Sequence, residues 1–205
     1  MPSSRSATTS RYVKHDKNRG KGAAVRTAIE RITGDWAIIQ DADLEYDPGE
    51  YKILLRPAEL GLADAVFGSR FVMGEFRRVL YFWHSMANKM LTLLTNLVTG
   101  LNLTDMETCY KLIRSDILKE LNLHSSGFDN EPERTVKLAR WGARIYEVPI
   151  SYRGRTYIEG KKIVGRDAVY AFVALFRYRF FDPRYCKHEG FLILQAIQNS
   201  HRFNR

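Results

Sequence analysis

The sequence predicts an α/β fold. Between residues 18 and 68, short apolar runs alternate with amphipathic stretches in the order helix, strand, helix, strand. This order indicates a sheet with parallel neighbouring strands and helices on its faces. The 205 residues suffice for one domain with a hydrophobic core, and no repeat or low-complexity linker divides them.

The first helix and the first strand are predicted between residues 18 and 40. Residues 18–33 start in a glycine-rich loop and continue as a helix, with Ala24, Ala28 and Ile32 on one face. Gly34 is expected at the C-terminal cap of this helix. The apolar run that follows, at residues 36–40, indicates a short buried strand.

The second helix has a clear start signal. Asp47 is expected to cap it, Pro48 to occupy its first position and Glu50 to complete its first turn. The helix is predicted to run to about residue 60, and residues 63–68 indicate the next strand.

A long apolar stretch at residues 79–99 predicts an amphipathic helix, because polar residues interrupt it too often for a transmembrane span. Its polar stripe comprises Ser85, Asn88, Thr92, Thr95 and Thr99, and its apolar stripe comprises Trp83, Ala87, Met90, Leu94 and Leu97. We expect the helix either to pack on the sheet or to lie in a membrane interface.

Five further elements complete the prediction. They are a strand at 109–114, a helix at 115–121 capped by Ser115, a helix at 130–141 ended by Gly142, a strand at 144–149 and a helix at 167–181. The last helix is apolar with a basic end and is long enough to lie on a bilayer, although too polar to span one comfortably.

Acidic side chains follow the first predicted strand directly. Asp41, Asp43 and Glu45 alternate along the chain, so an extended segment would place them on one side. Crowded carboxylates are stabilised by a cation, and Mg²⁺ or Mn²⁺ prefers such oxygen ligands. The alternative is a strand that simply ends in solvent. Ligands of α/β sheets bind beyond the carboxyl ends of strands, where Arg70 follows the next strand, and this favours a site.

The composition indicates a globular, basic protein. The net charge is +9, which favours an anionic partner such as a phosphorylated substrate, an anionic lipid or nucleic acid. Residues 152–187 mix basic and aromatic side chains, a combination that suits a membrane interface or nucleic acid. The two cysteines, Cys109 and Cys186, form no disulfide framework, which fits a reducing compartment.

Several motifs occur in a fixed order along the chain. They are NRGKGAA at 18–24, QDADLEYDP at 40–48, GSRF at 68–71, TDMETCYK at 104–111, GFDNEPE at 127–133 and EVPISYRGRTYIEGKK at 147–162. As an ordered set, they closely resemble family 2 glycosyltransferases of the polyprenyl-phosphate type, the group that includes dolichyl-phosphate mannose synthases. The resemblance covers roughly residues 11–181.

This resemblance implies a GT-A (Rossmann-like) fold with amphipathic interface helices. It also implies that an N-terminal portion, which holds the nucleotide base in the family, is absent here. The domain organisation expected is a disordered or non-native tail at residues 1–10, a partial GT-A domain at 11–181 and a C-terminal tail at 182–205.

The activity that the resemblance implies is inverting transfer of a sugar from a nucleotide-sugar, of the UDP-glucose or GDP-mannose type, to a polyprenyl or dolichyl phosphate. Mg²⁺ or Mn²⁺ would assist, because departure of the diphosphate builds negative charge. The protein would lie on the inner, cytoplasmic face of the membrane. The alternatives are an inactive fragment that keeps only the acceptor and membrane half, and a basic nucleic-acid-binding domain. No recognisable nucleic-acid-binding motif supports the latter, so we expect no nucleic-acid partner.

The resemblance also assigns residues to roles. The expected catalytic residues, which would position the acceptor phosphate or the sugar, are Arg70, Asp105, Arg155 and Lys161. The donor site would comprise Asn18, Gly20, Lys21, Asp41 and Asp43. The metal ligands would be Asp41, Asp43 and Glu45. Purely structural roles are the alternatives. The glycines would then form a tight turn, Asp105 would be an acidic turn residue, and Arg155 and Lys161 would lie in a solvated basic loop.

Overall fold

We analysed a computed structural model of the chain, which describes residues 10–72, 79, 82–127, 129–154 and 165–182. The predicted catalytic residues Arg155 and Lys161 lie outside these ranges, as do residues 1–9 and 183–205 of the two predicted tails.

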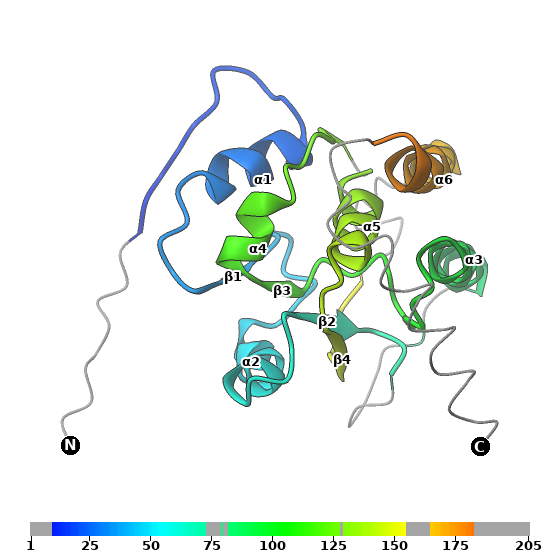
Figure 1. The fold of residues 1–205 in the computed structure, drawn as a ribbon, viewed down its shortest axis with the longest axis horizontal. Helices are drawn as coiled ribbons and strands as arrows, with labels where there is room; N and C mark the ends of the chain where they lie inside the picture. The colour runs from blue at the N-terminus through cyan, green and yellow to red at the C-terminus, as the bar shows by residue number, and fades with distance from the viewer. Residues whose placement is uncertain (1–9, 73–78, 80–81, 128, 155–164, 183–205) are drawn as a thin grey trace, which may run out of the picture.

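Helices and strands follow one another largely as predicted (Figure 1). In chain order they are α1 (Lys21–Ile29), β1 (Trp36–Ile38), the 3₁₀ helix η1 (Pro48–Glu50), α2 (Tyr51–Glu59), β2 (Ala65–Ser69), α3 (Phe82–Thr99), β3 (Lys111–Arg114), α4 (Ser115–Glu120), α5 (Asn130–Trp141), β4 (Ile145–Pro149) and α6 (Gly165–Phe180).

The four described strands form one sheet in the order β1-β3-β2-β4. Strands β2 and β4 are parallel, whereas β3 is antiparallel to both β1 and β2. The expectation that neighbouring strands are all parallel was therefore wrong, because β3 arrives later in the chain and inserts between β1 and β2. Strands β1, β2 and β4 nevertheless point the same way, so their carboxyl ends meet at one edge of the sheet.

Helices cover both faces of the sheet, with α2 on one face and α1, α4 and α5 on the other (Figure 1). Strand β2 is buried on both faces: Ala65 and Phe67 pack into the core under α4 and α5, and Val66 packs against Leu54 of α2. At roughly 25 cal/mol per Å² of apolar surface, burial of such side chains is the main favourable term for this architecture.

The ends of the helices confirm some of the predicted caps and correct others. Asp47 caps η1 by accepting a hydrogen bond from Gly49 N at 2.8 Å, and Gly142 ends α5 in the left-handed conformation at φ 81°. Gly34 does not cap α1, because the helix already ends at Ile29 with Glu30 at its C-cap. Ser115 is the first residue of α4 rather than its cap.

Helix α3 is amphipathic, but it is turned the opposite way from an ordinary surface helix. Its polar stripe faces the interior, where Asn88, Thr92 and Thr95 are buried. Its apolar stripe faces solvent, with Trp83 79% and Leu97 73% exposed. Helix α6 packs alongside α3 (Figure 1). No helix in the described ranges is both long and apolar enough to cross a membrane.

Candidate active site

The carboxyl ends of β1, β2 and β4 bring distant parts of the chain to one edge of the sheet. Asp41 follows β1, Arg70 follows β2 and Tyr152 follows β4. The segment that leads into β3, which carries Asp105 and Cys109, reaches the same edge because β3 runs in the opposite direction. The site therefore forms where the topology of an α/β sheet favours ligand binding.

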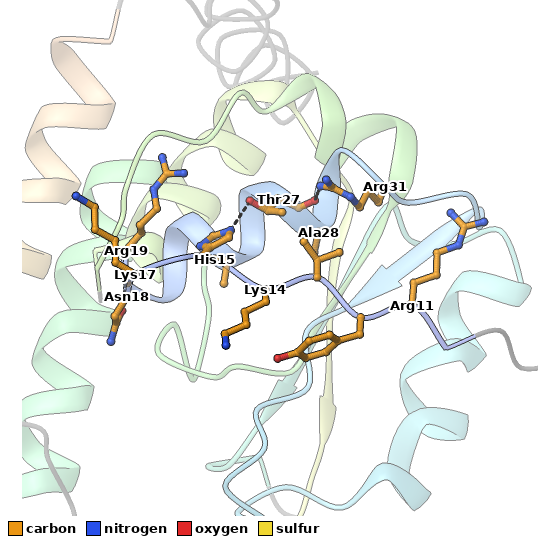
Figure 2. Close-up of a pocket in the computed structure, with 13 residues that line it drawn as sticks. Arg11, Lys14, His15, Lys17, Asn18, Arg19, Thr27, Ala28 and Arg31 are labelled. Atoms are coloured by element: carbon orange, nitrogen blue, oxygen red, sulfur yellow. Dashed lines mark hydrogen bonds between the residues drawn. The ribbon is translucent and has the colours of Figure 1, made fainter.

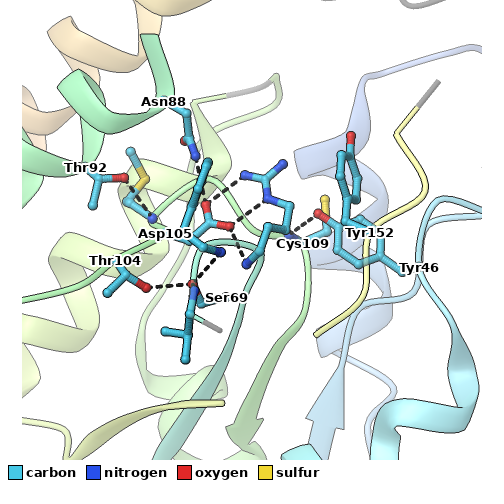
Figure 3. Close-up of polar contacts among 12 residues, drawn as sticks. Tyr46, Ser69, Asn88, Thr92, Thr104, Asp105, Cys109 and Tyr152 are labelled. Carbon is cyan, nitrogen blue, oxygen red and sulfur yellow. Dashed lines mark hydrogen bonds and ion pairs between the residues drawn. The ribbon is translucent and has the colours of Figure 1, made fainter. Parts of the chain in front are cut away.

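Arg70 and Asp105 form a buried ion pair at the centre of this edge (Figure 3). The Nε and Nη2 atoms of Arg70 lie 2.6 and 2.7 Å from the two carboxylate oxygens of Asp105, and the backbone N–H of Arg70 donates to Oδ2 at 3.0 Å. The Asp105 side chain is fully buried. Burial alone would raise the pKa of Asp105, but the Arg70 guanidinium outweighs it and lowers that pKa.

Helix α3 completes the surroundings of Asp105. Asn88 Nδ2 donates to Asp105 Oδ1 at 3.1 Å, and Thr92 Oγ1 accepts the N–H of Met106 at 3.1 Å (Figure 3). These bonds explain why the polar stripe of α3 faces inward: it satisfies backbone and side-chain groups that are buried beside the ion pair.

The acidic segment after β1 is a series of turns rather than the extended segment expected, because Leu44 adopts the left-handed conformation at φ 60°. Each acid has its own partner. Asp41 accepts from Lys21 Nζ at 2.8 Å, Asp43 accepts from the N–H of Glu45 at 3.2 Å, and Glu45 Oε2 accepts from the Tyr152 hydroxyl at 2.9 Å. Among the described residues, these three carboxylates are not arranged to hold one metal ion in common.

Lys21 pairs with the first acid of this segment. Its Nζ lies 2.8 Å from Asp41 Oδ2, 3.0 Å from Cys109 Sγ and 3.7 Å from Glu131 Oε1. Burial alone would lower the pKa of Lys21, but the carboxylates of Glu131 and Asp41 outweigh it and hold that pKa above its usual value. Lys21 therefore remains an ammonium at neutral pH.

The glycine-rich start of α1 packs directly on the backbone of residues 125–127. A Cβ at Gly20 would lie 2.2 Å from Ser126 O, and one at Gly22 would lie 2.1 Å from Ser125 O. The N–H of Gly20 donates to Asn18 Oδ1 and the N–H of Gly22 donates to Ser126 O. Close packing thus accounts for the glycines, and the N–H groups of Gly20 and Gly22 already have protein partners.

Glu131 joins the donor side of the site to a buried cluster. Its carboxylate accepts from Lys111 Nζ at 2.6 Å and from Arg134 Nη2, and Lys111 also donates to Met106 O at 2.7 Å. Burial alone would raise the pKa of Glu131, but Arg134, Lys111 and Lys21 lower it to about 2.

Glu107 interacts electrostatically with this cluster and with the Arg70–Asp105 pair. Its Oε1 is buried without a hydrogen-bond partner among the described residues. Burial raises the pKa of Glu107 to about 7, although Lys111 opposes the shift. Near neutral pH this carboxyl therefore exists in both protonation states.

Tyr152 touches both sides of the site. Its hydroxyl donates a hydrogen bond to Glu45 Oε2, and the centroid of its ring lies 5.0 Å from Arg70 Cζ. Figure 3 shows Tyr152 beside the Asp105 cluster. The N–H of the following residue, Arg153, donates to the carbonyl oxygen of Glu45 at 2.9 Å. The segment after β4 is thus attached to the acidic segment after β1.

A cavity of about 630 Å³ lies between residues 11–20 and α1 (Figure 2). Its lining includes the cationic side chains Arg11, Lys14, Lys17, Arg19 and Arg31 and no acidic one. His15 Nε2 lies 2.9 Å from Thr27 Oγ1 within it. The predicted donor residues Asn18 and Gly20 also line this cavity, so it adjoins the donor side, but its mostly exposed cations are screened by solvent and define no built anion site.

The acidic segment suits a hard divalent cation by its chemistry, because it supplies only carboxylate oxygens. Within the described ranges, however, no group of three or more His, Cys, Asp or Glu side chains is arranged to hold a metal ion. The protein would therefore contribute one or two carboxylates, with the remaining ligands from substrate phosphate and water, which is the usual arrangement for Mg²⁺.

The structure brings together two pairs of predicted site residues that are distant in the chain. Lys21 contacts Asp41, and Arg70 contacts Asp105. In the part of the chain that the structure describes, the predicted metal ligands Asp41, Asp43 and Glu45 are not arranged around one common ion. Sequence reasoning did not assign roles to Tyr152, Asn88, Glu107 or Lys111. One signal could have identified Tyr152, since it comes three residues after a strand whose carboxyl end lies at the site edge.

Comparison with solved structures identifies the fold class. The chain is similar to glucosyl-3-phosphoglycerate synthase from Mycobacterium tuberculosis, solved in complex with Mn²⁺, uridine-diphosphate and glucosyl-3-phosphoglycerate. The TM-score is 0.58 at 18% identity, over 78% of this chain and 55% of that chain. The GT-A glycosyltransferase fold expected from the sequence is thus confirmed.

Residues 7–122, more than half of the chain, match Glycosyl transferase family 2, and the protein belongs to this family. It is 34% identical over 157 residues to the undecaprenyl-phosphate mannosyltransferase of Micrococcus luteus, covering 72% of this chain and 62% of that protein. It is 29% identical over 139 residues to the low-salt glycan biosynthesis hexosyltransferase Agl6 of Haloferax volcanii, covering 67% of this chain and 33% of that protein. The chain thus spans less than two thirds of the length of these relatives.

Proposed function

We propose that this protein transfers one sugar, with inversion, from a nucleotide-sugar to a polyprenyl or dolichyl phosphate in a reaction that depends on a divalent cation. The observation that carries the proposal is the junction of two half-sites at one sheet edge. The acids at 41–45 and Lys21 form the donor side, and the Arg70–Asp105 pair forms the acceptor side.

On the donor side, Asp43 and Glu45 would hold Mg²⁺ or Mn²⁺ together with diphosphate oxygens. The cation would stabilise the charge that develops on the leaving diphosphate. Lys21 would exchange Asp41 for a phosphate oxygen, which leaves Asp41 for the metal or the ribose. The Mn²⁺ and uridine-diphosphate named for the structurally similar synthase support this assignment.

On the acceptor side, a phosphate monoester is already largely a dianion at neutral pH, because its second pKa is about 6. It needs positioning against the anomeric carbon more than it needs a general base. A guanidinium has five N–H donors, so Arg70 can hold Asp105 along one edge and a phosphate along another. Arg155 and Lys161 would add cationic charge. The undecaprenyl phosphate in the name of the Micrococcus luteus relative supports this acceptor class.

The outward faces of α3 and α6 would rest on the inner, cytoplasmic surface of the membrane that holds the acceptor. Large apolar side chains are exposed on both helices, among them Trp83, Met90, Leu97, Phe176 and Phe180. Basic side chains at Lys89 and Arg177 are exposed with them. Aromatic rings and basic groups together suit the headgroup layer.

A transfer assay tests the proposal. The full chain would be incubated with UDP-glucose or GDP-mannose, Mn²⁺ and anionic vesicles that contain polyprenyl phosphate, and the glycolipid product would be separated by chromatography. We expect product that requires the lipid phosphate and disappears with EDTA. Sugar released only to water, or product formation unaffected by EDTA, would contradict the proposal.

A further inference from the structure

We propose that Tyr152 is a positioning residue for both sides of the site. Its hydroxyl orients the carboxylate of Glu45, and its ring orients the guanidinium of Arg70. The inference rests on the proposed function, because it assigns Glu45 to the metal and Arg70 to the acceptor phosphate. It adds a residue that touches neither the metal nor the phosphate itself.

The hydroxyl of Tyr152 sets the orientation of Glu45. It donates to Glu45 Oε2 at 2.9 Å, and the N–H of Arg153 holds the carbonyl oxygen of the same glutamate at 2.9 Å. The hydroxyl is the donor in this bond, because an ionised carboxylate oxygen can only accept. Hydrogen bonds to a ligating carboxylate orient it, and their loss typically weakens metal affinity about 10–100-fold.

The ring of Tyr152 supports Arg70. The guanidinium carbon lies 5.0 Å from the ring centroid, within the range of a cation–π interaction. Because Asp105 already fixes the guanidinium along one edge, the ring limits its remaining freedom on one face. Removal of the hydroxyl alone would leave this contact in place.

The ring itself is held firmly. Tyr152 is only 9% exposed, and its ring centroid lies 5.3 Å from that of Tyr46. Gly154 passes so close that a Cβ there would lie 2.5 Å from Tyr152 Cε1. A side chain packed in this way can transmit a fixed geometry to both of its polar neighbours.

Two substitutions separate the two contacts. Tyr152→Phe removes the hydroxyl and keeps the ring, whereas Tyr152→Leu removes both. Tyr178→Phe is the matched control, because it deletes another buried tyrosyl hydroxyl. Tyr178 lies in α6, and its hydroxyl lies 2.9 Å from Ser125 Oγ rather than beside Glu45. Circular dichroism would confirm that each variant is folded, and all measurements would use the full chain.

The first readout is Mn²⁺ binding, measured by electron paramagnetic resonance with Mn²⁺ alone and then with UDP or GDP. We expect Tyr152→Phe to weaken Mn²⁺ binding at least about tenfold and Tyr178→Phe to leave it unchanged. In a Glu45→Gln background, Tyr152→Phe should cause no further loss, because the two side chains act through one hydrogen bond. A folded Tyr152→Phe variant with wild-type Mn²⁺ affinity would overturn the inference and leave the proposed function standing.

The second readout is the KM for polyprenyl phosphate in the transfer assay. Tyr152→Phe should change this KM little, while Tyr152→Leu should raise it several-fold because Arg70 loses its support. Equal KM values for the two variants would overturn the role of the ring. If the wild-type chain binds no Mn²⁺ with or without nucleotide, the metal site of the proposed function fails, and the inference fails with it.

Discussion

The carboxylate of Asp105 accepts two hydrogen bonds from the guanidinium of Arg70, although the two residues are 35 positions apart in the chain. Arg70 Nε lies 2.6 Å from Oδ2, and Nη2 lies 2.7 Å from Oδ1. The pair is almost completely excluded from solvent, with side-chain exposures of 9% for Arg70 and 0% for Asp105. It connects the end of β2 to the segment before β3, and Asn88 ties it to α3. The ion pair and this hydrogen bond together join the sheet, the candidate acceptor site and the helix proposed to face the membrane.

Removal of one partner of this pair should destabilise the fold strongly. Asp105→Asn keeps the shape but leaves the Arg70 charge buried without compensation, and we expect a loss of about 3–5 kcal/mol in the free energy of unfolding. Urea denaturation measures this loss. The control is Asp116→Asn, whose side chain is 60% exposed beside Arg114 and should cost less than about 1 kcal/mol. Similar costs for both variants would contradict the assignment of Asp105 to a buried pair.

Glu107 should make stability fall as the pH rises. Its pKa is about 7 in the folded state against 4.5 in the unfolded chain, so the protonated carboxyl favours folding and this contribution is lost as the pH rises from about 4.5 through 7. Glu107→Gln mimics the protonated form. At pH 8 it should stabilise the protein by up to about 3 kcal/mol, and at pH 4 by almost nothing. Urea denaturation at both pH values tests this, with the exposed Glu30→Gln as control; a pH-independent difference would contradict it.

Glu131 should have the opposite pH dependence. Its pKa is about 2 in the folded state against 4.5 in the unfolded chain, so its contribution is fully present above pH 4.5 and is lost as the pH falls toward 2. Glu131→Gln should therefore lower the free energy of unfolding by about 3 kcal/mol at pH 7, and by progressively less as the pH falls below 4.5. Urea denaturation of the wild type and the variant between pH 3 and 7 measures how the difference between their free energies of unfolding shrinks. A difference that stays constant over this pH range would show that the ion pairs of Glu131 do not stabilise the fold.

The outward face of α3 should control membrane binding. Trp83→Glu together with Met90→Glu replaces side chains that are 79% and 60% exposed, so neither change should disturb the core. We expect co-sedimentation with anionic vesicles to weaken tenfold or more, because each apolar side chain contributes roughly 2 kcal/mol on burial. Leu60→Glu, at a site 57% exposed at the end of α2, is the control. An equal loss of vesicle binding in the double variant and in Leu60→Glu would show that no particular face meets the bilayer.

Much of the fold could be predicted from local signals. Asp47 and Gly142 mark helix ends by side-chain and backbone chemistry that acts within a few residues, and both are where that chemistry places them. The position of β3 could not be predicted, because the insertion of a strand between two earlier ones depends on long-range pairing. The orientation of α3 could not be predicted either, since a helical period reveals two faces but not which one meets buried polar groups.

Only part of the candidate site could be predicted from the sequence. The acids at 41–45 and Arg70 follow strands, so their place at the sheet edge follows from the fold class. The pairing of Arg70 with Asp105 and the contact of Tyr152 with Glu45 join residues that are far apart in the chain. Only the packed sheet brings these groups within hydrogen-bonding distance.

The most direct test of the central claim is calorimetric titration of the full chain with UDP-glucose and with GDP-mannose, each with and without Mn²⁺, for the wild type and for Asp43→Ala. The account predicts that one nucleotide-sugar binds the wild type in a Mn²⁺-dependent manner and that Asp43→Ala abolishes this binding. Failure of a folded wild-type chain to bind either donor, or binding that depends on neither Mn²⁺ nor Asp43, would contradict it.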